Sequence, residues 1–274
     1  MTLDRNSDSP APSGVAPSGP APSGTAAIAD AAHAAAPEVR AWDFRGRTAV
    51  VTGGGRGIGR AIAEGLKAGG ARVHVFDRAA EPGLTGIETH AVDVAESASV
   101  SAALNELGAG VDLLVNNAGI TRDRSIAKMS DDEWQSVLDV NLTGAFNLIR
   151  AVGPGMMAAG FGRIVNVVSI NGLRGKFGQA NYAASKAGLV ALTKTAAREF
   201  GPRGVSVNAV APGMVLTEMT LALAAEHRQK ALEESVLKRL PGVDDVAAAV
   251  LFLLSDHAAF ITGQVLKVDA GQYI

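Results

Sequence analysis

Cysteine is absent from this sequence of 274 residues, which excludes disulfide bonds, thiolate zinc sites and cysteine nucleophiles. Long apolar runs are absent too: no stretch approaches the roughly 18 residues of a spanning helix, so we expect no membrane protein. The formal net charge of −2 gives no basic surface for a polyphosphate, so we expect no nucleic-acid partner. The five histidines show no HExxH or comparable spacing, so we expect no metal site.

Proline is concentrated at the start of the chain. Six of the 11 prolines fall before residue 41, where Ala-Pro-Ser-Gly recurs at 11–14, 16–19 and 21–24. Such a segment has too few apolar side chains to offset the entropy of ordering, which predicts a disordered tail over residues 1–42. It has neither the basic start nor the continuous apolar segment of a secretory signal, so we expect a cytoplasmic protein. Residues 43–274 suit a single domain.

Short β-branched runs alternate with helical patterns through this domain. Continuous apolar strands separated by helices are typical of a parallel sheet covered on both faces. We therefore predict an α/β fold with one doubly wound parallel sheet of about seven strands. The expected strands are Thr48–Thr52, Arg72–Phe76, Glu88–Val94, Leu113–Val115, Arg163–Val168, Val205–Val210 and Gln264–Val268, and the expected helices include Ile58–Lys67, Glu133–Met157 and Ala183–Phe200. The segment Arg78–Ile87 is too short for a crossover helix and is expected to be a loop or a single turn.

Many of the 32 glycines are scattered, but several follow the first strand directly. The run fits T-G-x-x-x-G-x-G, with Gly53, Gly57 and Gly59 in the glycine positions and Arg56 and Ile58 between them. Glycines allow a tight strand-to-helix turn and let the backbone approach a pyrophosphate at the helix N-terminus, where unpaired N–H groups point outward. A glycine-rich turn without a ligand is the alternative.

Two aspartates end the next two strands. Asp77 stands about twenty residues beyond the glycines, where a carboxylate would accept hydrogen bonds from both adenosine ribose hydroxyls and repel a 2′-phosphate. This favours NAD(H), although Arg56 and Arg78 could hold the 2′-phosphate of NADP(H). The alternative for Asp77 is a turn residue without a ligand. Asp93 ends the third strand and is expected to meet the adenine edge.

One of the two tyrosines precedes a lysine by one helical turn. Tyr182 and Lys186 therefore lie on the same helix face. A phenol is a poor acid–base group at neutral pH, and an adjacent ammonium would stabilise the phenolate and lower the pKa of the tyrosine. Ser169 ends a strand 13 residues earlier and could hydrogen-bond the same substrate oxygen. Asn141 lies in an apolar helical stretch, where it is either functional or a hydrogen-bonded core residue.

Five motifs in order make the chain resemble the short-chain dehydrogenase/reductase family over residues 43–274. They are Thr52–Gly59, Asn116-Asn117-Ala118-Gly119, Ser169, Tyr182-x-x-x-Lys186 and Pro212-Gly213. The resemblance implies a Rossmann-type sheet that binds NAD(H) or NADP(H), and a homotetramer built through the long helices Glu133–Met157 and Ala183–Phe200. The expected cofactor-binding residues are Gly53, Arg56, Gly57, Ile58, Gly59, Asp77, Asp93, Val94, Asn116, Ala118, Gly119, Tyr182, Lys186, Pro212, Gly213, Val215 and Thr217.

The resemblance also implies a catalytic tetrad. Tyr182 would give a proton to a carbonyl oxygen as hydride arrives, or take it in the alcohol-oxidising direction. Ser169 would orient that oxygen, Lys186 would hold the nicotinamide ribose and lower the pKa of Tyr182, and Asn141 would fix a water in a proton relay.

Within the family, two groups are most similar to this chain. Ile120-Thr121-Arg122-Asp123 is similar to 3-oxoacyl-(acyl-carrier-protein) reductases, and the segment 171–182 looks like acetoacetyl-CoA reductases. Arg174 and Gln179 are candidate substrate residues, with a solvated loop as the alternative for Arg174. Residues 157–161, directly before Gly162-Arg163, include no basic residue, whereas the carrier-protein reductases usually have basic residues there.

We therefore expect an enzyme that transfers a hydride between nicotinamide and a ketone or secondary alcohol. The favoured substrate is a 3-oxoacyl thioester of CoA or a carrier protein. One alternative is a dehydrogenase of a small or cyclic secondary alcohol, and another is a non-catalytic dinucleotide-sensing regulator.

Overall fold

A computed structural model describes residues 42–79, 84–217, 220 and 225–274. The predicted tail over residues 1–42 lies outside this range except for Trp42, so its disorder stays a prediction. Part of the predicted loop Arg78–Ile87 also lies outside it, and its described residues contain no helix.

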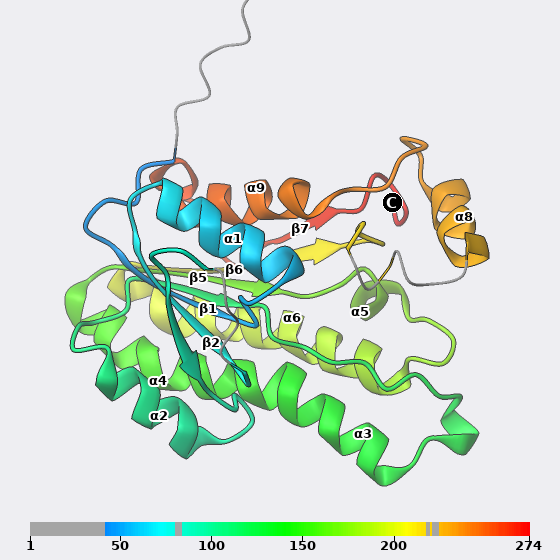
Figure 1. Ribbon diagram of the computed structural model, residues 1–274, viewed down its shortest axis with the longest axis horizontal. Helices are drawn as coiled ribbons and strands as arrows, with labels where there is room; N and C mark the ends of the chain where they lie inside the picture. Colours follow the sequence, from blue (N-terminus) through cyan, green and yellow to red (C-terminus); the bar gives the residue numbers. More distant parts are fainter. Residues whose placement is uncertain (1–41, 80–83, 218–219, 221–224) are drawn as a thin grey trace, which may run out of the picture. The chain divides into compact units, whose positions relative to one another are not determined.

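The described domain is built on one seven-stranded, wholly parallel sheet (Figure 1). Its strand order is β3-β2-β1-β4-β5-β6-β7, which confirms the predicted doubly wound α/β fold. The strands are β1 (Thr48–Thr52), β2 (Arg72–Asp77), β3 (Glu88–Ala91), β4 (Leu113–Asn116), β5 (Gly162–Val167), β6 (Val205–Pro212) and β7 (Val265–Val268). Because all strands run the same way, their carboxyl ends lie along one edge, where such sheets bind ligands.

Helices cover both faces of the sheet, as Figure 1 shows. The helices are α1 (Gly57–Ala68), α2 (Ser97–Glu106), α3 (Asp131–Leu138), α4 (Gly144–Ala159), α5 (Asn171–Arg174), α6 (Ala180–Phe200), α8 (Ala225–Glu234) and α9 (Val243–Leu254). Helices α1 and α9 pack on one face, and α2, α4 and α6 on the other. No helix in the described part of the chain is long and apolar enough to cross a membrane.

Alternate residues of the central strands build two separate cores. Val51 of β1 packs with α1 and α9, while its neighbour Val50 packs with α2 and α4. All five residues of β1 are buried, which explains the continuous apolar run read from the sequence.

Three local differences from the predicted elements matter for function. Helix α6 begins at Ala180, so Tyr182 lies in its first turn. The predicted helix Glu133–Met157 is interrupted by a π-helical segment, Asp139–Thr143, a distortion often found at functional sites. Strand β3 ends at Ala91 because Asp93 forms a side-chain turn, its Oδ1 accepting from the Ala95 N–H at 3.0 Å.

Candidate active site

The glycine run forms the predicted tight turn between β1 and α1. Gly53 and Gly57 have φ of +62° and +54°, a left-handed conformation that favours glycine. A Cβ on Gly59 would lie 2.1 Å from the Gly53 carbonyl oxygen, so a side chain there would disrupt the turn. Arg56 is the N-cap of α1, and its side chain makes no capping hydrogen bond. The first turn of α1 contains no acidic residue, which leaves its positive end to an anion such as a pyrophosphate.

The end of β4 is joined to this turn by hydrogen bonds. The Thr52 hydroxyl accepts from the backbone N–H groups of Asn117 and Ala118, both at 3.0 Å. The Asn117 amide donates to the Thr52 and Gly53 carbonyl oxygens at 3.0 and 2.9 Å. Asn117 therefore fixes the shape of the glycine turn, a role that sequence reasoning did not assign to it.

Asp77 lies beside the glycine turn, as expected for a ribose-binding carboxylate. Its Oδ2 accepts from the Gly55 N–H at 3.3 Å, and its Oδ1 accepts from the Arg78 N–H at 2.8 Å. These backbone donors aim the carboxylate at the loop that would hold the dinucleotide. The Arg56 and Arg78 side chains are exposed.

The expected adenine-side residues lie after β3. Asp93 is partly buried, and Val94 is 7% exposed and packs in the core between the sheet and α2 and α4. The Asn147 amide of α4 donates to the carbonyl oxygens of Val94 and Ala95 at 3.0 and 3.2 Å, which holds this segment against the domain.

Three of the four predicted catalytic side chains converge between β5 and α6. Ser169 follows β5, and its hydroxyl lies close enough to the Tyr182 phenol to lower the pKa of that group. The Lys186 ammonium lies 5.7 Å from the centroid of the Tyr182 ring and donates to the Val167 carbonyl oxygen at 2.8 Å. Lys186 is 3% exposed although it carries a charge.

Burial sets the pKa values of this pair. Desolvation raises the pKa of Tyr182, the Ser169 hydrogen bond lowers it, and the negative charge of Asp123 raises it further. The net direction is upward, opposite to the lowering expected from Lys186, because the cost of burying a phenolate dominates. Desolvation also lowers the pKa of Lys186 from 10.5 to about 8. The Tyr182 phenol therefore keeps its proton at neutral pH.

Asn141, the fourth predicted member, lies in the π-helical segment and is 1% exposed. Its Oδ1 accepts from the Ile120 N–H at 2.8 Å, and its amide donates to the Ile120 carbonyl oxygen at 3.0 Å and to the Ser185 hydroxyl at 3.2 Å. A Cβ on Gly119 would lie 3.2 Å from Asn141 Oδ1 and 3.6 Å from Lys186 Nζ. Asn141 thus borders the same space as Lys186 and clamps the chain after β4.

The side chain of Asn116 is hydrogen-bonded inside the domain. Its amide donates to Asn166 Oδ1 at 2.8 Å, and the Asn166 amide donates to the Thr193 hydroxyl at 2.8 Å. This buried chain connects β4, β5 and α6 within the domain. The Asn116 side chain therefore joins β4 to β5, while Ala118 and Gly119 border the carboxyl edge of the sheet.

The segment after β6 lies over the site, as the Pro212-Gly213 motif suggested. A Cβ on Gly213 would lie 2.2 Å from Gln272 Oε1, and that oxygen accepts from the Met214 N–H at 2.7 Å. Val215 is buried, and the Thr217 methyl group would lie 4.0 Å from a Cβ on Gly57. The segment thus reaches the glycine turn from the other side of the site.

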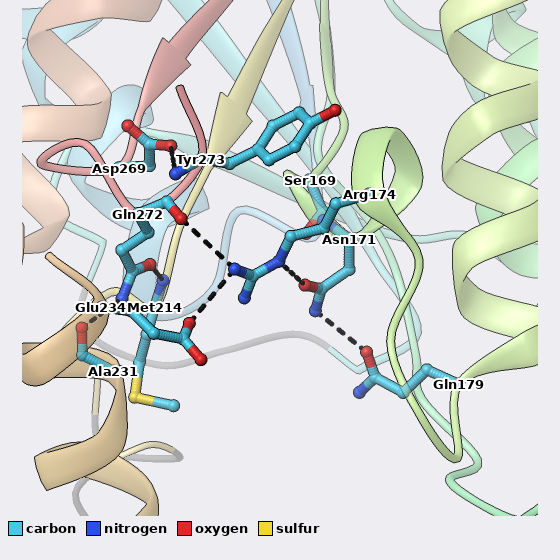
Figure 2. Close-up of polar contacts among 10 residues, drawn as sticks. All are labelled: Ser169, Asn171, Arg174, Gln179, Met214, Ala231, Glu234, Asp269, Gln272 and Tyr273. Carbon is cyan, nitrogen blue, oxygen red and sulfur yellow. Dashed lines mark hydrogen bonds and ion pairs between the residues drawn. The ribbon is translucent and has the colours of Figure 1, made fainter.

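The two candidate substrate residues belong to a hydrogen-bonded network (Figure 2). Arg174 Nη1 lies 3.1 Å from Glu234 Oε2 and 3.3 Å from the Gln272 carbonyl oxygen. Asn171 connects the two candidates: Arg174 Nε donates to its Oδ1 at 3.4 Å, and its amide donates to Gln179 Oε1 at 3.0 Å. The Arg174 charge is therefore compensated by Glu234 of α8.

Gln179 carries the network to the other wall of the site. Its amide donates to Asp123 Oδ2 at 2.9 Å, and Asp123 is the carboxylate that raises the pKa of Tyr182. Sequence reasoning missed Asp123, Asn171 and Glu234 as site residues, since only the folded chain brings them to Arg174 and Gln179. Asp123 and Asn171 lie in the segments 120–123 and 171–182, whose resemblance to family members was the sequence signal that could have indicated them.

Comparison with known proteins supports one family. A protein-family model described as enoyl-(acyl carrier protein) reductase matches residues 53–272. A 3-oxoacyl-[acyl-carrier-protein] reductase of Salmonella typhimurium is 44% identical over 242 residues, covering 84% of this chain and 99% of that protein. The enzyme of the same name from Vibrio cholerae is 45% identical over 244 residues, covering 85% and 99%.

Solved structures agree with the sequence relatives. A 3-oxoacyl-[acyl-carrier protein] reductase from Brucella melitensis superposes with a TM-score of 0.80 at 37% identity, covering 84% of this chain and 92% of that chain. A candidate 2-deoxy-D-gluconate 3-dehydrogenase from Agrobacterium tumefaciens, with bound NADP, also gives 0.80 at 36% identity, covering 85% and 98%. The chain belongs to the short-chain dehydrogenase/reductase family and is an NAD(P)-dependent oxidoreductase of ketone and secondary-alcohol groups.

Proposed function

We propose that the chain reduces a 3-oxoacyl thioester, carried by CoA or by an acyl carrier protein, to the 3-hydroxyacyl thioester. The observation that carries the proposal is the convergence of Tyr182, Ser169 and Lys186, with the Lys186 ammonium 5.7 Å from the centroid of the Tyr182 ring. The Tyr182 phenol carries a proton at neutral pH, so it can supply one to a carbonyl oxygen. The substrate class is supported by the relatives, which are named 3-oxoacyl-[acyl-carrier-protein] reductases.

The proposed chemistry divides among the tetrad. The reduced nicotinamide, when bound, supplies the hydride to the carbonyl carbon. Ser169 orients the carbonyl oxygen, and Tyr182 donates its proton to that oxygen, giving the alcohol. Lys186 holds the nicotinamide ribose beside Tyr182 and limits the cost of the phenolate that forms. Asn141 anchors the chain at Ile120 and orders a water between Lys186 and solvent for reprotonation.

NADH is the proposed cofactor. The Asp77 carboxylate is held at the glycine turn by two backbone donors, a position suited to ribose hydroxyls and unfavourable to a 2′-phosphate. The uncapped N-terminus of α1 fits the pyrophosphate that both cofactors share. Separate titrations of NADH and NADPH by fluorescence would test the proposal, which requires the tighter binding of NADH; tighter binding of NADPH contradicts it.

Because Glu234 compensates the charge of Arg174, we propose that Arg174 shapes the substrate wall through α8, beside Gln179, instead of pairing with a substrate anion.

The direct test of substrate is steady-state oxidation of the reduced cofactor with acetoacetyl-CoA. Turnover of acetoacetyl-CoA with a kcat/KM well above that of simple ketones is expected. No turnover with any ketone, in a chain that binds cofactor, contradicts the proposal.

A second candidate is a dehydrogenase of a small secondary alcohol, favoured by one structural comparison. The structure from Agrobacterium tumefaciens at TM-score 0.80 is named for 2-deoxy-D-gluconate. Assaying 2-deoxy-D-gluconate with the oxidised cofactor beside acetoacetyl-CoA separates the two candidates. Faster turnover of the sugar acid would select the second candidate.

We also propose a homotetramer formed through α4 and α6. Phe146 of α4 and Trp134 of α3 are 42% and 39% exposed, and burial of these side chains against another copy would remove apolar surface from water. Sedimentation velocity should give a tetramer. A monomer at micromolar concentration contradicts this assembly.

A further inference from the structure

Three side chains of metal-binding types meet on β2 and β3, away from the proposed tetrad. In the parallel pairing, His74 lies opposite Glu88, and Phe76 lies opposite His90. These positions alternate along their strands, so the three polar side chains lie on one face of the sheet. His74 is fully buried, His90 is partly buried, and the Glu88 side chain is 55% exposed.

The distances suit a four-coordinate cation. His74 Nδ1 lies 3.1 Å from His90 Nε2 and 3.6 Å from Glu88 Oε2, and one ligand atom from each residue lies within 4.8 Å of the other two. Tetrahedral zinc with bonds of about 2.0–2.1 Å places neighbouring ligand atoms about 3.3–3.4 Å apart. The two measured separations bracket that value, so only small side-chain movements would complete the arrangement.

An ion pair with Arg72 orients the Glu88 carboxylate toward His74. Arg72 Nε lies 3.3 Å from Glu88 Oε1, which orients the carboxylate and leaves Oε2 facing His74. The ion pair with Arg72 uses Oε1, so Oε2 stays available as the third ligand.

The two imidazoles contact each other inside an otherwise apolar core that includes Phe76 and Val50. Their contact accommodates one proton, which a metal ion between His74 Nδ1 and His90 Nε2 would replace. His74 Nε2 has no hydrogen-bond partner among the described residues and is not one of the proposed ligand atoms.

We propose that His74, His90 and Glu88 form a structural site for a divalent transition-metal ion of the zinc type, which fastens the edge strand β3 to β2. Imidazole and carboxylate ligands suit zinc over magnesium, and the exposed side at Glu88 leaves a fourth position to water. The HExxH spacing does not describe this site, because its ligands come from two strands and are brought together only by their register.

Zinc binding to the full-length, EDTA-stripped chain tests the proposal. Isothermal titration with zinc chloride should give one equivalent per chain, with a higher melting temperature when zinc is present. His90→Gln and Glu88→Gln should each weaken zinc binding by at least about tenfold, as expected for loss of a ligand. His227→Gln, which changes an exposed histidine outside the site, is the matched control and should bind zinc like the parent chain.

Titrations with cobalt and magnesium test the geometry and the selectivity of the site. Cobalt should give the strong visible absorption of a tetrahedral site in the parent chain, and His90→Gln should lose it; magnesium should not bind. Circular dichroism of each stripped variant checks that it is folded, and the exposed Glu88 provides a variant that leaves the core intact. The proposal is overturned if the parent chain binds no stoichiometric zinc, or if both variants bind it as tightly as the parent chain.

Discussion

Replacing Lys186 with methionine should change how stability depends on pH. Burial lowers the pKa of this lysine from 10.5 to about 8 in the folded chain. Between these two values the unfolded chain binds more protons than the folded one, so the free energy of unfolding rises with pH. The shift costs the folded state about 3 kcal/mol at about pH 7 and about 1.5 kcal/mol at about pH 9.5.

The expected difference is therefore measurable. Relative to Lys186→Met, the parent chain should gain about 2 kcal/mol of unfolding free energy between about pH 7 and pH 9.5. The hydrogen bond from Lys186 to the Val167 carbonyl oxygen is lost in the variant at both pH values, so its contribution largely cancels. The raised pKa of Tyr182 places its titration above this range.

Urea denaturation followed by circular dichroism, at one protein concentration, measures this change. Lys194→Met removes an exposed lysine from the same helix and should follow the parent chain at both pH values. If the parent chain and Lys186→Met differ by the same amount at both pH values, or if the parent chain loses stability relative to the variant as pH rises, the buried-cation reasoning is refuted.

Three further substitutions test separate parts of the site. Tyr182→Phe should lower kcat by about 10²–10⁴-fold without changing the Kd of the cofactor, because only the proton donor is removed; steady-state kinetics and fluorescence titration check this, and an unchanged kcat contradicts the role. Asp77→Ser should weaken NADH binding by about tenfold and strengthen NADPH binding, since it removes charge-assisted hydrogen bonds and a repulsive charge; equal effects on both cofactors would argue against ribose recognition. Gly59→Ala should destabilise the chain by about 1–3 kcal/mol in urea unfolding, because its Cβ would lie 2.1 Å from the Gly53 carbonyl oxygen; parent-like stability would show that the turn can widen.

The fold was predictable because the apolar strands are continuous and the helices between them are regular. Thr48–Thr52 was predicted as a strand with its observed bounds, and the predicted helix Ala183–Phe200 differs from α6 only at its start. The π-helical segment was not predictable from local sequence, and Asn141 within it hydrogen-bonds the backbone of Ile120, which lies 21 residues earlier in the chain.

The candidate site was predictable where its residues form local motifs. The glycine turn and the Tyr182–Lys186 spacing follow from local geometry. The pKa direction of Tyr182 did not, because it depends on burial and on Asp123 from another segment. The pairing of Arg174 with Glu234, which is 60 residues further along the chain, likewise arises only when α8 lies beside α5.

Tracing the hydride tests the proposed reaction most directly. Acetoacetyl-CoA would be incubated with the full-length chain and a nicotinamide cofactor deuterated at its hydride-donating carbon, and the product analysed by mass spectrometry. The account predicts a 3-hydroxyacyl-CoA carrying one deuterium on the carbon of the new alcohol, formed by the parent chain and almost absent with Tyr182→Phe. A product without deuterium, no product, or equal product from both chains would contradict it.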